Sequence, residues 1–182
     1  DNEVRLGNFK KNASNIETLE LFNKEMLIVG FGRIGKSLIK RCLGFDMKVN
    51  VYDPFVTAEV IKEFGGNKIE NLDKGLENCD YLSLHIPLTE KTKNMINYEK
   101  IKSMKKNAVI INTSRGGIIN EIDLDKALKD NIIFGAGLDV FEKEPIDKNN
   151  PLINNKKVLL SPHSATFTNE CKSRMAIETT KN

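Results

Sequence analysis

The chain has 182 residues, of which 40% are hydrophobic, and its formal net charge is only +3 at pH 7. This length and composition are typical of one globular domain with a well-buried core. Lysines are mixed with acidic residues and form no long basic block, so the charge pattern gives no special support to binding of nucleic acid or a membrane surface, and we expect neither as a partner. No apolar run approaches the roughly 20 residues that span a bilayer, and the first residues lack the layout of a signal peptide.

The cysteines indicate a reducing compartment. Cys42, Cys79 and Cys171 are an odd number at wide spacing, and no two of them form a CxxC pair. Such a set fits neither a disulfide framework nor a zinc site. We therefore expect a cytoplasmic protein without a metal, and, because the chain does not begin with methionine, a true N-terminus that lies upstream.

Short apolar runs alternate with stretches of helical spacing along the chain. We predict strands at residues 26–32, 47–53, 81–87, 108–114, 135–141 and 157–162. We predict helices at residues 33–45, 57–66, 71–79, 97–105, 121–131 and 168–182, with a polar loop at 142–155. This alternation predicts an α/β fold, a doubly wound parallel sheet of Rossmann type between two layers of helices. No repeat or flexible linker interrupts it, so we expect a single domain over residues 1–182, with the sheet core at about 24–165.

The sequence GFGRIG follows the first predicted strand and opens the first predicted helix, with Gly30, Gly32 and Gly35 in GxGxxG spacing. Gly30 permits a tight turn, Gly32 lets a pyrophosphate approach the backbone, and Gly35 lets the helix pack close to the strand. The helix start adds free N–H groups and the positive end of a dipole. The motif predicts a dinucleotide site, and the alternative is a glycine turn that binds nothing.

Asp53 ends the second predicted strand, 18 residues after Gly35. A carboxylate at this position accepts hydrogen bonds from the adenosine ribose hydroxyls and repels a 2′-phosphate. The following residues, PFVT, supply no arginine to pair with that phosphate. We therefore expect NAD rather than NADP as the cofactor, and the alternative is an aspartate that merely lies at the surface.

Three further residues with useful chemistry lie at the ends of later predicted strands, namely Arg115, Asp139 and His163. In open α/β sheets, ligands bind in the crevice outside the carboxyl ends of the strands. Singly, Arg115 could be a surface salt-bridge partner, Asp139 a turn cap and His163 a structural histidine. Because all three share one edge with the glycine turn, we predict that His163 is catalytic.

With these motifs in order and spacing, the chain resembles the NAD-dependent D-isomer-specific 2-hydroxyacid dehydrogenases, which include phosphoglycerate dehydrogenases and glyoxylate or hydroxypyruvate reductases. The resemblance rests on VGFGRIG, VYDP, LSLHIPLTEKTKNMIN, AVIINTSRGGIINE, ALKDNIIFGAGLDVFEKEP and LLSPHSA. It implies hydride transfer between NAD(H) and a small D-2-hydroxy acid or 2-oxo acid of the phosphoglycerate, glycerate or glyoxylate type. It also implies a homodimer, and HSATFTNEC leans toward the glyoxylate or hydroxypyruvate reductase branch.

Carried over by position, the resemblance implies three catalytic residues, which are Arg115 of SRGG, Glu144 of FEKEP and His163 of SPH. Imidazole titrates near neutral pH, so His163 would give a proton to the substrate oxygen in reduction and take it back in oxidation. Glu144 would orient the His163 ring. Arg115 would hold the substrate carboxylate and stabilise the developing alkoxide.

The resemblance further implies a set of cofactor contacts along the same sheet edge. The set comprises Gly30, Gly32, Arg33, Ile34, Gly35, Asp53, His85, Pro87, Thr113, Ser114, Arg115, Asp139, His163 and Ala165. Within it, Arg33 and Ile34 are contacts of the pyrophosphate loop. Thr113 is a backbone contact, and Asp139 is the partner of the nicotinamide carboxamide. His85 is expected to line the nicotinamide side of the crevice, with a packed histidine as the alternative.

Some expectations concern departures from the family and the limits of the chain. Ala165 replaces a usual glycine, Asn120 replaces a usual acidic residue, and Glu142 is expected to face solvent. The family's substrate-binding domain is largely absent, so we expect the isolated chain to bind NAD but to turn over substrate poorly. An NADH-responsive corepressor module on the same scaffold is the alternative function, although the sequence shows no peptide-docking extension.

Overall fold

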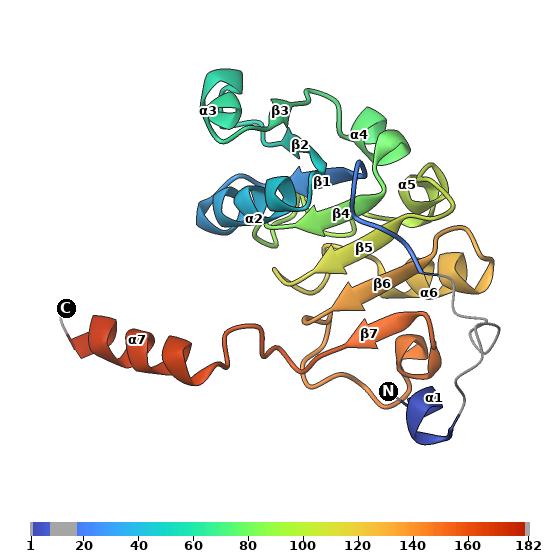
Figure 1. Cartoon of the computed structure of the whole chain (residues 1–182). Helices are drawn as coiled ribbons and strands as arrows, with labels where there is room; N and C mark the ends of the chain where they lie inside the picture. The colour runs from blue at the N-terminus through green and yellow to red at the C-terminus, as the bar shows by residue number, and fades with distance from the viewer. Residues whose placement is uncertain (1, 8–17, 181–182) are drawn as a thin grey trace.

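The computed structural model describes residues 2–7 and 18–180. Its centre is a seven-stranded parallel sheet with the order β3-β2-β1-β4-β5-β6-β7 (Figure 1). The strands are β1 (Glu25–Val29), β2 (Lys48–Tyr52), β3 (Asn67–Lys68), β4 (Tyr81–Leu84), β5 (Val109–Asn112), β6 (Gly135–Leu138) and β7 (Val158–Leu160). The predicted fold class, a doubly wound parallel sheet, is confirmed.

Helices connect successive strands, which is what a parallel sheet requires. The connecting helices are α2 (Arg33–Gly44), α3 (Ala58–Glu63), α4 (Leu72–Asn78), α5 (Tyr98–Lys102), α6 (Glu121–Lys129) and the 3₁₀ helix η1 (Pro151–Asn154). The helix α1 (Asn2–Arg5) precedes the sheet and α7 (Asn169–Thr180) follows it. Within the part of the chain that the structure describes, none of these helices is long and apolar enough to cross a membrane.

The alternation of side chains along β1 divides the core into two layers. Met26 and Ile28 are buried in a cluster with residues of α2 and α3, which includes Ile39 of α2. Leu27 and Val29 are buried on the opposite face, in a larger cluster with residues of α4, α5 and α6. Successive residues of a strand point to opposite faces of the sheet. When helices cover both faces of a central strand, all its residues are buried, and its sequence is a continuous apolar run.

The strand order reverses between β1 and β4, which are neighbours although three helices and two strands separate them in the chain. At such a switch point the connections leave to opposite sides and open a crevice at the carboxyl ends of the strands. The glycine turn follows β1 and His85 follows β4, so both lie at this point. Val29 pairs with Leu84 in the last register position before the crevice.

The structure corrects the sequence prediction at several element boundaries. The predicted strand at 26–32 ends at Val29, because the glycine turn begins there. The predicted helix at 57–66 stops at Glu63, and Gly65, with φ +86°, turns the chain into the unpredicted β3, which pairs with β2 over only two residues. The polar loop at 142–155 contains η1, whose start is capped by the side chain of Asn150.

The C-terminal helix α7 has no buried residue and projects away from the sheet (Figure 1). The sequence predicts a helix to residue 182, and the last two residues of that range lie outside the described residues.

Candidate functional site

Two glycines of the turn after β1 are required by close backbone contacts. Gly30 has φ +95°, and a Cβ added there would lie 2.5 Å from the His85 carbonyl oxygen. A Cβ at Gly35 would lie 2.4 Å from the Gly30 carbonyl oxygen. Gly32 differs, because no atom lies within 4 Å of its added Cβ. The fold therefore accounts for Gly30 and Gly35, whereas at Gly32 the structure leaves open space.

The start of α2 lacks the cap that other helices of the chain have. The helices α4, α5 and α6 each begin after an asparagine whose side chain accepts a hydrogen bond from a backbone N–H in the first turn. Gly32 precedes α2 without a side-chain cap, and the hydrogen bond from Lys36 N to Gly32 O spans the first turn at 3.0 Å. The N–H groups of Arg33, Ile34 and Gly35 thus have no intrahelical acceptor, a disposition that fits the pyrophosphate of a dinucleotide.

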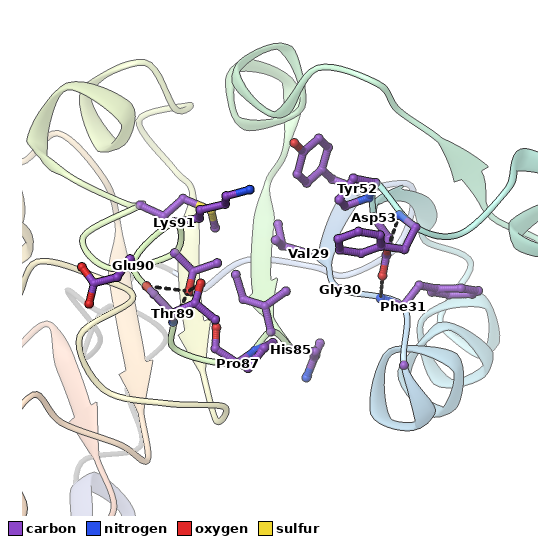
Figure 2. Close-up of a pocket in the computed structure, with 16 residues that line it drawn as sticks. Val29, Gly30, Phe31, Tyr52, Asp53, His85, Pro87, Thr89, Glu90 and Lys91 are labelled. Atoms are coloured by element: carbon purple, nitrogen blue, oxygen red, sulfur yellow. Dashed lines mark hydrogen bonds between the residues drawn. The ribbon is translucent and has the colours of Figure 1, made fainter.

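Asp53 fixes the glycine turn relative to the end of β2. Its Oδ2 accepts a hydrogen bond from Phe31 N at 2.7 Å, and its Oδ1 accepts one from Phe55 N at 2.8 Å (Figure 2). Each carboxylate oxygen keeps a second lone pair, so the group can still accept from ribose hydroxyls. The predicted residue therefore lies in the predicted place, and it also orders the turn.

A pocket of about 740 Å³ opens at the switch point, within the usual range for small-molecule sites. Its lining includes Gly30, Asp53 and Phe55 from the segments after β1 and β2, and Pro87 and Lys91 from the segment after β4. Figure 2 shows Asp53 and Lys91 on opposite walls. Phe55 is 94% exposed, which leaves an aromatic face available to a ligand. The predicted catalytic residues do not line this pocket.

His85 also lines the pocket, whereas its expected place on the nicotinamide side of the crevice stays a prediction. Its Nε2 lies 2.9 Å from Ser83 Oγ, and within the described residues its buried Nδ1 has no hydrogen-bond partner. Burial lowers the pKa of His85, which favours the neutral ring. Beyond His85, the carbonyl oxygen of Pro87 accepts a hydrogen bond from Thr92 Oγ1 at 2.7 Å, which orders the wall that Pro87 begins.

His163 and Glu144 are in direct contact, although 19 residues separate them. His163 Nδ1 lies 2.7 Å from Glu144 Oε2, and Glu144 Oε1 accepts a hydrogen bond from Phe141 N at 3.0 Å. The bond to His163, followed by that from Phe141, lowers the pKa of Glu144. The side chains are 53% and 37% exposed, so the pair is open to a substrate. His163 has φ +52°, a strained conformation of the kind that concentrates at functional sites.

Asp139 holds the loop that carries His163. Asp139 is 3% exposed, and its carboxylate accepts hydrogen bonds from Ser161 Oγ and, at 2.9 Å each, from Ser164 N and Ala165 N. Burial opposes ionisation, but these hydrogen bonds together lower the pKa of Asp139 below its ordinary value. The structure thus gives Asp139 a positioning role that the sequence does not predict, while its expected contact with a carboxamide stays a prediction.

The loop that carries Arg115 is organised by Asn112, a residue that the sequence analysis missed. Asn112 is 2% exposed, its Nδ2 donates to Arg115 O at 2.8 Å, and its Oδ1 accepts from Ser114 N at 3.0 Å. A buried amide in the otherwise apolar run AVIIN was the available signal. Arg115 and Thr113 are exposed, and Arg115 Nη1 donates to Ser114 O at 2.6 Å. The guanidinium is therefore turned onto its own loop, and no contact joins it to His163 or Glu144 among the described residues.

Glu142 only partly follows its prediction. It is exposed, as expected of a solvent-facing residue, yet its carboxylate accepts a hydrogen bond from Glu121 N at 3.3 Å. No group of three histidine, cysteine or acidic side chains in the described ranges could hold a metal ion.

The chain is similar to one family of known proteins, and the family model and two relatives agree on it. The family described as D-isomer specific 2-hydroxyacid dehydrogenase, NAD binding domain, matches residues 1–165. A glyoxylate reductase of Korarchaeum cryptofilum is 44% identical over 86% of this chain and 47% of its own length. A D-3-phosphoglycerate dehydrogenase of Methanocaldococcus jannaschii is 41% identical over 85% of this chain and 29% of its own length.

Among solved structures, a D-lactate dehydrogenase from Aquifex aeolicus complexed with NAD and lactic acid superposes with a TM-score of 0.88 at 35% identity. The match covers 99% of this chain and 58% of that one. The chain thus spans less than two thirds of each of these three proteins.

Proposed function

Because the chain belongs to the D-isomer specific 2-hydroxyacid dehydrogenase family through its NAD-binding domain, we propose that it provides the coenzyme half of a dehydrogenase. The reaction is hydride transfer between NAD(H) and a small D-2-hydroxy acid or its 2-oxo acid. The observation that carries the proposal is the 2.7 Å contact between His163 Nδ1 and Glu144 Oε2, at the sheet edge that also bears the glycine turn. Bound NAD supplies the hydride chemistry.

His163 is the general acid and base of the proposed reaction. Because Nδ1 is engaged with Glu144, Nε2 is the ring atom that gives a proton to the substrate oxygen in reduction and takes it in oxidation. Glu144 is held ionised by its lowered pKa, and its contact with Nδ1 orients the ring. The pair therefore holds a proton at the place where the reaction consumes or releases one.

Arg115 binds the substrate carboxylate in this proposal. Its side chain is exposed, and within the described residues its hydrogen bond is to the Ser114 carbonyl oxygen, so it can exchange that acceptor for an anion. A guanidinium offers forked donors that match a carboxylate and carries a permanent charge that stabilises the developing alkoxide. Its loop is fixed by Asn112, which limits the volume that the guanidinium can reach.

The pocket at the switch point takes the adenosine half of the cofactor. Asp53 accepts from the ribose hydroxyls there, and the uncapped start of α2 binds the pyrophosphate. The loops after β5, β6 and β7, which carry the three catalytic residues, would then hold the nicotinamide half. We expect NAD rather than NADP, because the Asp53 carboxylate would repel a 2′-phosphate.

Replacing Asp53 by serine together with Pro54→Arg is expected to shift the preference toward NADP, because charge repulsion is replaced by a phosphate partner. The affinity for NADH should fall as well, since Asp53 also accepts the Phe31 and Phe55 amides. Dissociation constants for NADH and NADPH, measured calorimetrically on both proteins, test this. Pro54→Arg alone is the matched control, and a wild-type preference for NADPH would refute the assignment.

A second domain completes the substrate pocket in this proposal. The exposure of Arg115 and His163 is consistent with a cleft that another domain covers. The homodimer and the cytoplasmic location stay predictions.

The proposed function is tested by incubating the natural full-length protein with NADH and glyoxylate, hydroxypyruvate or 3-phosphohydroxypyruvate. We expect the NADH absorbance to decrease with at least one of these acids. No oxidation with any of them, combined with specific binding of a short peptide, would favour the corepressor alternative. The relatives reported above bear enzyme names and do not favour that alternative.

A further inference from the structure

We propose that Glu121 is a positioning residue for the reaction, whose buried carboxylate fixes the turn that presents Glu144 to His163. The inference rests on the proposed function, in which Glu144 and His163 hold the transferred proton. Glu121 is the first residue of α6 and is only 6% exposed. It touches neither the pocket nor His163, so its action on the reaction is indirect.

Glu121 and Glu142 hold each other by reciprocal hydrogen bonds. The Glu121 carboxylate accepts from Glu142 N at 2.5 Å, and the Glu142 carboxylate accepts from Glu121 N at 3.3 Å. The second oxygen of Glu121 accepts from Asn150 Nδ2, and Asn150 Oδ1 in turn accepts from Leu152 N at 3.0 Å. Glu121 thus ties α6 to the chain on both sides of Glu144, at positions 142 and 150.

The turn at 141–144 transmits this anchoring to the Glu144 carboxylate. Phe141 N donates to Glu144 Oε1, which leaves Oε2 for His163. The turn also packs against Gly116, where an added Cβ would lie 1.8 Å from the Phe141 carbonyl oxygen. The turn therefore contacts both Glu121 and the residue next to Arg115, so the loops of the catalytic residues are joined through it.

The cost of burying Glu121 indicates that its carboxylate has a specific use. Among the described residues it forms no ion pair, and Glu142 and Glu144 add like charge nearby. Burial raises the pKa of Glu121, with the two neighbouring carboxylates contributing in the same direction. A buried carboxylate without a cation is destabilising unless its hydrogen bonds compensate, and a neutral residue could begin α6 without this cost.

The test uses Glu121→Ala, Glu121→Gln and a control on the same helix. Asp125 is also 6% exposed, but its carboxylate contacts Lys129 Nζ at 2.6 Å and Asn155 Nδ2 at 2.9 Å, away from the 141–144 turn. Asp125→Ala therefore removes a buried carboxylate of α6 without releasing the turn. Glutamine at position 121 keeps one oxygen for the Glu142 amide and loses the bond from Asn150.

In the full-length enzyme, Glu121→Ala is expected to lower kcat about 10- to 100-fold, because small misplacements of catalytic groups have effects of this size. The NADH dissociation constant should change less than about threefold, Glu121→Gln should recover most of the turnover, and Asp125→Ala should leave kcat within about threefold. When Glu144 is already replaced by alanine, adding Glu121→Ala should lower kcat little further, because Glu121 acts through Glu144. Equal losses in both backgrounds, or an equal loss in Asp125→Ala, would overturn the inference.

A second measurement is independent of turnover and uses the chain itself. The carboxyl ¹³C resonance of Glu144 is titrated by NMR in the wild type and in the Glu121 and Asp125 variants. Without the Glu121 carboxylate the 141–144 turn should be less fixed, which weakens the hydrogen bond between Glu144 and His163. The pKa of Glu144 should therefore rise toward its ordinary value in Glu121→Ala, and rise less in Glu121→Gln. An unchanged Glu144 pKa in both Glu121 variants would overturn the inference, even if the proposed reaction were confirmed; a raised pKa supports it even if the reaction were not found. If Glu121→Ala does not fold, the Glu144 titration in Glu121→Gln decides, because a raised Glu144 pKa supports the inference and an unchanged one overturns it.

Discussion

Replacing His163 by alanine is expected to lower the turnover of the full-length enzyme by about 10²- to 10⁴-fold, the range that a positioned general acid contributes. The NADH dissociation constant should change less than about threefold. His163 lies beyond β7, whereas the glycine turn and the Asp53 pocket lie at β1, β2 and β4. The change therefore removes a proton donor without touching the groups that bind adenosine and pyrophosphate.

Steady-state kinetics with the best 2-oxo acid, followed by an NADH titration of the same samples, separates the two effects. Thr166→Ala is the matched control, because Thr166 is exposed on the same loop and has no assigned role. The control should retain turnover. If His163→Ala retained it too, His163 would be one more exposed loop residue, and its 2.7 Å contact with Glu144 would be structural.

The sequence predicts those parts of the site that depend on local chemistry. The strand, glycine turn and helix at 25–44 follow from apolar runs and from backbone conformations that glycine adopts readily, and the structure confirms their order, although the strand ends at Val29. The polar residues after β5, β6 and β7 share an edge because parallel strands end on the same side. The contact between His163 and Glu144 was expected only through resemblance to a family.

The supporting residues could not be predicted because their contacts join distant segments. Glu121 meets residue 142, and Asp139 meets residues 161, 164 and 165, so neither partner is visible in a local window. Asn112 could have been found from the sequence, because it is an amide in an apolar run that is expected to be buried. A buried amide needs hydrogen-bond partners, so it indicates a polar contact nearby. Element ends were also misjudged where short-range turns, such as that at Gly65, override helical spacing.

Replacing Gly32 by alanine is expected to weaken NADH binding about 10- to 150-fold while leaving the free chain nearly as stable as the wild type. No atom lies within 4 Å of the added Cβ and the backbone is extended, so the free protein accommodates the methyl group. The methyl group instead occupies the space through which the pyrophosphate reaches the N–H groups of α2. Hydrogen bonds to a charged group are worth about 1.5–3 kcal/mol, which gives the stated loss of affinity.

Gly30→Ala is the matched comparison, because the same methyl group at that position should destabilise the free chain. Its φ of +95° and the 2.5 Å approach to the His85 carbonyl oxygen leave no room for a side chain. The backbone strain alone costs about 1–3 kcal/mol. Urea denaturation and NADH titration test both variants. Gly32→Ala should be stable but bind NADH poorly, whereas Gly30→Ala should be destabilised. If Gly32→Ala bound NADH as tightly as the wild type, the pyrophosphate would lie elsewhere, and the uncapped start of α2 would not be its site.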